Sequence, residues 1–214
     1  MLIQKLAIAI GSFIVASLLI ACIVRSPCKS TSKAIILKNF ENKLDLLKRK
    51  VRKLAVARSS IMISPTDAFT DGFCSHWALL VYADNNTKFL ISPSDDKSVI
   101  VHRLSNKTFK HINSTHDSFI NCNGYTYTFN PKCLYKITHK TVTLSQLIND
   151  MYRVVSEKDY TILSNNCHRH VAIAANPYID SKYKIQYIDN PFKLFVVGIC
   201  EILDPTLPFF HSCR

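Results

Sequence analysis

The sequence predicts an α+β fold in which an antiparallel β-meander or barrel packs on helices. Short runs rich in β-branched and aromatic residues, separated by polar turns, fill residues 73–137. Two segments with helical patterns follow them, at 143–155 and 167–175. Strands that gather in one part of a chain and helices that gather in another are typical of the α+β class.

The strand predictions come from apolar and polar residues that alternate between turn signals. The candidates are Phe73–Tyr82, Lys88–Ser92, Ser98–Leu104, Tyr125–Phe129, Cys133–Ile137 and, nearer the C-terminus, Tyr183–Ile188. Turns are predicted at 84–86 and 92–96, where Asp, Asn, Ser and Pro accumulate. The polar stretch 105–124 is expected to be a long loop.

Two helices are predicted from their caps and apolar faces. Thr143 is a good N-cap for the first helix, and one apolar face follows it, formed by Leu144, Leu147, Ile148, Met151 and Val155. Asn166 is a good N-cap for the second, which makes Cys167 its first residue. Pro177 ends the alanine-rich run that follows.

The N-terminus contains a long apolar run from Leu6 to Val24. Its length matches the roughly 20 residues that cross a bilayer as a helix. The larger basic flank follows the run, so residues 25–214 are expected on the cytoplasmic side of a single-pass membrane protein. A cleaved signal peptide is one alternative. A lipoprotein signal is another, because Leu19-Ile20-Ala21-Cys22 resembles a bacterial lipidation box.

Residues 25–60 are predicted to form a basic stalk between the anchor at 1–24 and a folded domain at 61–214. The apolar residues are spaced 3, 4, 3, 4 and 3 apart at Leu37, Phe40, Leu44, Leu47, Val51 and Leu54. One interpretation is a short coiled coil that makes the protein a homodimer through 37–54. The other is an amphipathic helix that packs on its own domain or lies among lipid headgroups.

The charge is concentrated in the same part of the chain. The formal net charge is +12, and residues 1–60 account for +10 of it, with twelve Lys and Arg against two acidic residues. The remaining residues carry only +2. A basic arm is typical of contact with anionic lipid headgroups, so membrane lipid is the expected partner and nucleic acid is not.

The eight cysteines contain no C-x-x-C pair, which favours free thiols in a reducing compartment. Zinc is an alternative, because the side chains that could supply ligands include Cys74, His76, Cys167, His168 and His170. No knuckle of two closely spaced cysteines accompanies them. No cofactor or resident metal is therefore predicted, and a zinc-binding structural module is kept as an alternative.

Cys167 and His76 are the candidate catalytic pair. A thiol at the first turn of a helix faces the positive end of the helix dipole and unpaired N–H groups, both of which favour the nucleophilic thiolate. His76 precedes a strongly apolar strand, where alternation places it with Ala78, Leu80 and Tyr82, opposite Trp77. An imidazole on a rigid strand can act as a general base.

This order of residues resembles that of the circularly permuted papain-like families. They are the permuted NlpC/P60 group, with the lecithin retinol acyltransferase-like proteins, and the PPPDE peptidases. The likeness covers about residues 70–176, from His76 with its apolar strand to Asn166-Cys167 at a later helix start. In these families a third polar residue orients the histidine. Ser92 and His102 are the candidates here, and Arg169 stands where a histidine is usual.

The resemblance implies a cysteine hydrolase or acyltransferase. Cys167 would attack an ester, amide or thioester of a small molecule, lipid or protein, while His76 takes its proton. Large DNA viruses encode members of the permuted group, and the Lys- and Asn-rich, Gly-poor composition fits an AT-rich genome. These points imply a viral protein in a virion or in a host intracellular membrane. The alternative is an inactive assembly protein on the same fold.

Overall fold

The computed structural model describes residues 34–41, 43–60, 75–94, 96–105, 108–111, 118–122, 125–137, 141–160 and 165–187. These residues form an α+β fold, which confirms the predicted class. The strands are β1 (Ile35–Lys38), β2 (Val51–Ser60), β3 (Ser75–Ala83), β4 (Lys88–Pro93), β5 (Val99–Leu104), β6 (Phe109–His111), β7 (Ser118–Cys122), β8 (Tyr125–Phe129) and β9 (Tyr135–Lys136). The α-helices are α2 (Lys43–Leu47), α3 (Leu144–Glu157) and α4 (Cys167–Ala175), and 3-10 helices lie at Asp84–Asn86, Asn176–Tyr178 and Ser181–Tyr183.

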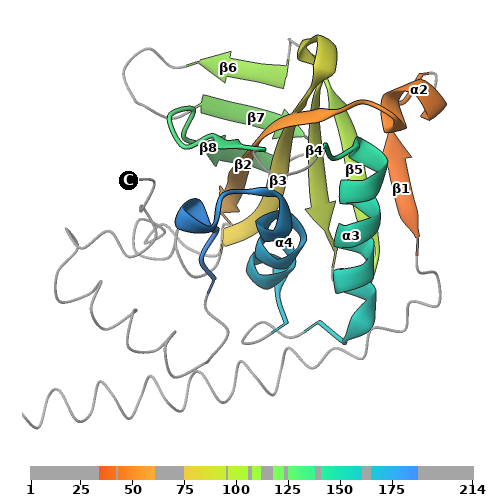
Figure 1. The fold of residues 1–214 in the computed structure, drawn as a ribbon, viewed down its shortest axis with the longest axis vertical. Helices are drawn as coiled ribbons and strands as arrows, with labels where there is room; N and C mark the ends of the chain where they lie inside the picture. Colours follow the sequence, from red (N-terminus) through yellow and green to blue (C-terminus); the bar gives the residue numbers. More distant parts are fainter. Residues whose placement is uncertain are drawn as a thin grey trace, which may run out of the picture.

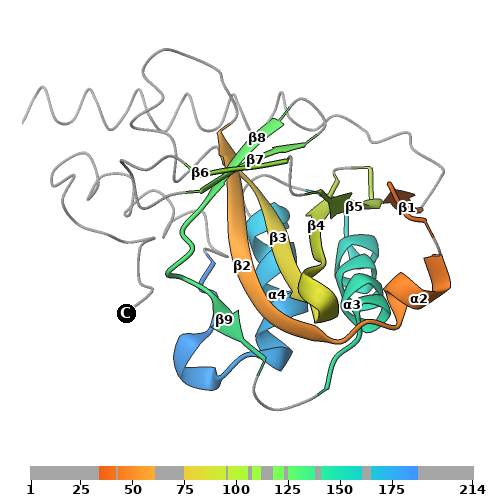
Figure 2. The same ribbon diagram turned by 90° about the horizontal axis from the view of Figure 1, so that it is seen from above.

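The strands form one curled, mixed sheet in the order β1-β5-β4-β3-β2-β8-β7-β6, with β9 also paired to β2. The first three strands of the predicted antiparallel meander form one, β3-β4-β5, and β1 joins β5 in parallel. The later two, β8 and β9, pair with β2 instead of continuing from β5. In Figure 1, β6 to β8 run across the direction of β3 to β5, because the long, curved β2 turns the sheet (Figure 2). The helices α3 and α4 pack on each other and on β3, β4 and β5 (Figures 1 and 2).

Two apolar clusters fill the two faces of the sheet. Trp77, Leu79 and Val81 of β3 belong to the larger cluster, together with the apolar faces of α3 and α4. The intervening Ala78 and Leu80 belong to the second cluster, together with apolar residues of β7 and β8. This division confirms the predicted alternation of β3, since successive strand residues point to opposite faces. The capped helix is confirmed as well, because the Thr143 hydroxyl accepts a hydrogen bond from Gln146 N at 3.2 Å.

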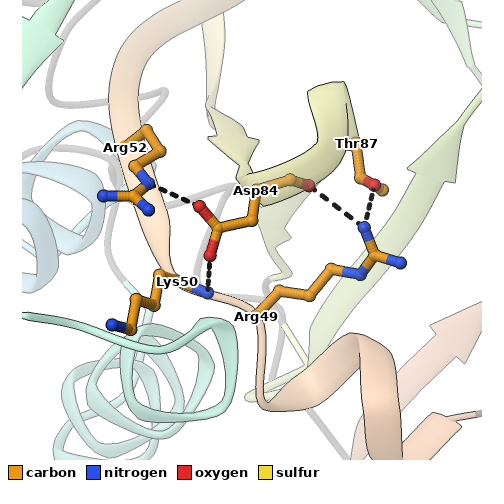
Figure 3. Close-up of polar contacts among 5 residues, drawn as sticks. All are labelled: Arg49, Lys50, Arg52, Asp84 and Thr87. Atoms are coloured by element: carbon orange, nitrogen blue, oxygen red, sulfur yellow. Dashed lines mark hydrogen bonds and ion pairs between the residues drawn. The ribbon is translucent and has the colours of Figure 1, made fainter.

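A polar clamp fixes the turn between β3 and β4 (Figure 3). The Asp84 carboxylate accepts hydrogen bonds from Lys50 N and from Arg52, while Arg49 donates to Asp84 O and to the Thr87 hydroxyl. Asn85 and Asn86 have φ angles of 59° and 56°, in the left-handed region that asparagine tolerates better than most residues. The clamp joins the start of β2 to the turn and so fixes the β3-β4 hairpin.

Two local predictions are wrong. The expected loop at 105–124 contains β6 and β7, and β7 pairs with β8 over five residues. The Asn123-Gly124 dipeptide between β7 and β8 is a strong hairpin signal that identifies this pair. The strand expected at Tyr183–Ile188 is not formed in the described residues, where the 3-10 helix Ser181–Tyr183 is followed by irregular chain to residue 187.

The helix predicted over residues 37–54 is also wrong. The segment contains β1, the short α2 and the start of β2, so no continuous helix presents a heptad seam. Leu44 is 74% exposed, whereas Leu54 is fully buried in the core. Pairing with β3 along nearly its whole length buries β2, and this tertiary contact overrides the 3-4 spacing. The coiled-coil dimer through 37–54 therefore loses its basis.

The domain boundary expected at residue 61 is wrong for the same reason, because β1 and β2 belong to the sheet. The anchor predicted at 1–24 lies outside the described residues. Within the part of the chain that is described, no helix has the length and the apolar composition needed to cross a bilayer.

Candidate active site

Cys167 is the first residue of α4, as the sequence predicts. Asn166 has extended backbone angles (φ −113°, ψ 177°), and its side-chain oxygen accepts a hydrogen bond from Arg169 N at 3.1 Å. This is the geometry of an N-cap. The cap places the thiol at the first turn, where the backbone N–H groups of Cys167 and His168 act on the sulfur.

Two further donors reach the sulfur from outside the helix. Trp77 N lies 3.4 Å from Cys167 Sγ, and the Tyr160 hydroxyl lies 3.9 Å from it. Cys167 is only 4% exposed. Burial raises the pKa of the thiol, and the hydrogen bonds from Trp77, Tyr160 and the helix start oppose that rise. The resting residue is therefore a thiol, and a base has to remove its proton before the sulfur can attack.

The sulfur lies where the β3-β4 ladder ends. The last pair in that ladder is Leu79 with Ile91, so the next residue of β3 with an N–H directed toward β4 is Trp77. The same register would place Trp77 opposite Pro93, but the ladder stops before that pair. The Trp77 N–H donates to Cys167 Sγ instead. The end of the β3-β4 ladder thus leaves the Trp77 N–H directed at the sulfur at the start of α4.

His76, the residue before Trp77, is joined to β4 at the same end of the sheet. Its Nε2 lies 2.7 Å from Ser92 Oγ, so the structure brings the first of the two candidate orienting residues to the imidazole. The Ser92 hydroxyl is also hydrogen-bonded to Tyr127 on β8, whose ring centroid is 6.3 Å from that of His76. Burial raises the pKa of Tyr127 to about 12, so its hydroxyl remains protonated.

The two members of the candidate pair approach β3 from different faces. His76 shares a face with Ala78 and Leu80, whereas Cys167 belongs to the cluster that contains Trp77. Tyr127 lies on the His76 side, and the sulfur meets β3 on the Trp77 side.

His102, the second candidate orienting residue, lies one strand further away. It is on β5 opposite Leu90 of β4, and it is buried. Burial lowers its pKa, and the charge of Lys38, its partner on β1, lowers it further. The β4-β5 register places the Leu90–His102 pair two pairs away from the Ser92–Ile100 pair. Ser92 is the candidate that the structure brings into contact with His76.

Aromatic contacts form the wall on the helix side of β3. The Trp77 ring stacks on His168 with centroids 4.1 Å apart, and the Arg58 guanidinium lies 5.1 Å from the centroid of the Trp77 ring. Two tyrosines of the site, Tyr160 and Tyr127, are not apparent from the sequence. Tyr160 is seven residues before the cysteine, a spacing that carries no motif, and Tyr127 reaches the site only because the sheet curls.

The described residues contain no cluster of side chains that would support the zinc interpretation. Cys74 lies outside them. No group of three or more His, Cys, Asp or Glu side chains in the described part of the chain is placed to hold a metal ion.

Comparison of the chain with family models, with curated proteins and with solved structures finds no match in any of the three.

Proposed function

We propose that this chain is a cysteine hydrolase or acyltransferase in which Cys167 is the nucleophile and His76 is the general base. The observation that carries the proposal is the position of the sulfur. Cys167 Sγ lies at a capped helix start, against the N–H of Trp77, the residue that follows His76 on β3. The sulfur and the strand that bears the imidazole therefore meet at one point of the fold.

The imidazole is hydrogen-bonded to the neighbouring strand β4. Its Nε2 is engaged by the Ser92 hydroxyl, so Nδ1 is the nitrogen that would take the thiol proton. Ser92 would fix the ring as the third residue of the site, and Tyr127 would in turn fix the Ser92 hydroxyl. Both are carried by strands, which hold side chains more precisely than loops do.

The reaction would follow thiol acyl chemistry. His76 takes the Cys167 proton as Sγ forms a bond to the carbonyl carbon of an ester, amide or thioester. The oxyanion would be stabilised by Cys167 N–H and by the Tyr160 hydroxyl. The carbon–heteroatom bond then breaks, His76 returns its proton to the leaving group, and a thioester remains on Cys167. Water or a second acceptor, deprotonated by His76, releases the acyl group.

The resemblance to permuted papain-like proteins supports the same chemistry, because it rests on the order His76 before Cys167. The apolar run at 6–24 would keep the domain at a membrane, where lipid or lipid-modified acyl substrates are concentrated. A virion or a host intracellular membrane is the location that this resemblance implies.

An inactive assembly protein on this fold is the second candidate. Two observations favour it: Cys167 is 4% exposed, and its sulfur packs in the cluster on the face opposite to that of His76. In that case the thiol and the imidazole are structural. The two candidates differ in whether the chemistry of Cys167 depends on His76.

The test is acylation of the full-length chain by short- and long-chain p-nitrophenyl esters and thioesters, followed by peptide mass spectrometry. We expect a thioester on Cys167 that is absent from Cys167→Ser. His76→Ala should form it about 10²- to 10⁴-fold more slowly, the usual contribution of a general base. Cys122→Ser, which removes a half-buried free thiol elsewhere, is the matched control. An unacylated Cys167, or acylation indifferent to His76→Ala, would overturn the enzyme proposal and leave the assembly protein.

A further inference from the structure

Asn165, two residues before Cys167, joins the start of α4 to the chain that follows α3. Its side-chain oxygen accepts hydrogen bonds from Arg169 Nη1 at 2.9 Å and from His170 Nε2 at 3.1 Å. Its amide nitrogen donates to Lys158 O at 3.2 Å and to Asp159 O at 2.9 Å. The amide thus makes all four hydrogen bonds of which it is capable, and two of them hold the backbone just before Tyr160.

His170, on α4, is one of the two residues that donate to the Asn165 oxygen. It is 1% exposed, and burial, aided by the charge of Arg169, lowers its pKa to about 4, so it is neutral at pH 7. Since Nε2 faces an acceptor oxygen, Nε2 carries the proton. Nδ1 is buried without a hydrogen-bond partner among the described residues, which is a cost in free energy.

Tyr160 is constrained by both Asn165 and His170. Its backbone directly follows the two carbonyls bound by Asn165, and its ring meets the His170 ring edge-on with centroids 6.1 Å apart. The Tyr160 hydroxyl then reaches Cys167 Sγ at 3.9 Å. This contact is longer than the one from Trp77 N to the same sulfur, so a small movement of Tyr160 would break it.

We propose that Asn165 and His170 are positioning residues that hold the Tyr160 hydroxyl against Cys167 Sγ. The inference rests on the proposed function, to which it adds two residues that never touch the substrate. When Tyr160 is in place, its O–H stabilises the thiolate before attack and then the oxyanion. When it moves away, the sulfur loses one of the few donors that offset its burial.

The experiment is the pH dependence of Cys167 alkylation by iodoacetamide in the full-length chain, with the modified residue identified by peptide mass. Tyr160→Phe should slow alkylation of Cys167 about 3- to 10-fold below the midpoint, because a rise of one unit in a thiol pKa lowers its thiolate fraction tenfold. Asn165→Leu should slow it by a similar factor. The double variant should be no slower than either single variant, since both act through one contact.

Asn176→Leu is the matched control. Asn176 binds the backbone of Ile185 through both its amide nitrogen and its oxygen, but at the other end of α4. It should leave the alkylation profile unchanged. His170→Leu should reproduce the shift, and His170→Gln should restore the original profile, because its amide can still donate to Asn165. This pair keeps the test open if Asn165→Leu does not fold.

Two results would overturn the inference. One is a Tyr160→Phe profile equal to that of the unaltered chain. The other is a set of shifts that add in the double variant, which would show that Asn165 acts on the sulfur by a separate route. The catalytic proposal fails on a different measurement, the missing acyl adduct, so shifted profiles without acylation would retain the positioning role and remove the enzyme.

Discussion

Nε2 of His76 lies 2.7 Å from the hydroxyl oxygen of Ser92. The two residues belong to neighbouring strands, β3 and β4, at the end of the sheet where the ladder between these strands stops. The hydroxyl bonds the imidazole across this opening, and the N–H of the next residue, Trp77, is given to Cys167 Sγ. The end of the β3-β4 ladder is thus where His76 is hydrogen-bonded to Ser92 and where Cys167 Sγ accepts from Trp77.

Removal of the Ser92 hydroxyl should test whether that contact orients a working base. Ser92→Ala should lower the rate of Cys167 acylation about 10-fold and cost only about 1 kcal/mol of unfolding free energy, the usual net value of one hydrogen bond. Acylation is followed by mass and unfolding by urea titration. Ser98→Ala removes another buried hydroxyl, one bonded to Asp96, and should leave the acylation rate unchanged. Equal rates in both variants would argue against an orienting role.

The helix cap should contribute both to stability and to the thiol. Asn166→Ala removes the acceptor of Arg169 N and should destabilise the protein by about 1 kcal/mol. It should also slow iodoacetamide alkylation of Cys167, because a frayed first turn no longer directs its N–H groups to the sulfur. Asn166→Ser keeps a capping oxygen and should behave as the unaltered chain does. If Asn166→Ala were destabilised but equally reactive, the cap would be structural alone.

His170 should make the protein sensitive to mild acid. Burial lowers its pKa from 6.5 to about 4, so the unfolded chain binds a proton that the folded chain excludes between these values. The stability is therefore complete above pH 6.5 and is lost as the pH falls toward 4. Between pH 7 and pH 5 the unaltered chain should lose about 2 kcal/mol more unfolding free energy than His170→Gln. Parallel urea titrations at the two pH values measure the difference, and equal losses would contradict it.

Two leucines of the apparent heptad seam distinguish a sheet from a coiled coil. Leu54→Ala should cost about 2–5 kcal/mol, because this side chain is fully buried in the core. Leu44→Ala should change stability by no more than about 0.5 kcal/mol, since Leu44 is 74% exposed. Thermal unfolding of the two variants gives the comparison. Similar costs for both, with a loss of dimer in sedimentation, would restore the coiled coil.

The predictions that held depend on local patterns with one physical solution. Thr143 and Asn166 each follow non-helical residues and precede an apolar face, and both cap helices as expected. The run Tyr125–Phe129 is a strand with the predicted bounds. The failure at residues 37–54 involves a pattern with two solutions. The 3-4 spacing from Leu37 to Leu54 fits a helix as well as a strand-helix-strand unit, and only the space beside β3 decided between them.

The sequence by itself determined the capped helix that begins at Cys167, the strand alternation that opposes His76 to Trp77, and the α+β class, because caps and periodicity act within a few residues. The tertiary structure decided which residues meet. Ser92 reaches His76 because β3 and β4 pair in one register, Tyr127 arrives through the curl of the sheet, and Tyr160 reaches the sulfur through the contacts of Asn165 and His170. Such distances depend on how the whole sheet closes, and no local pattern in the chain encodes them.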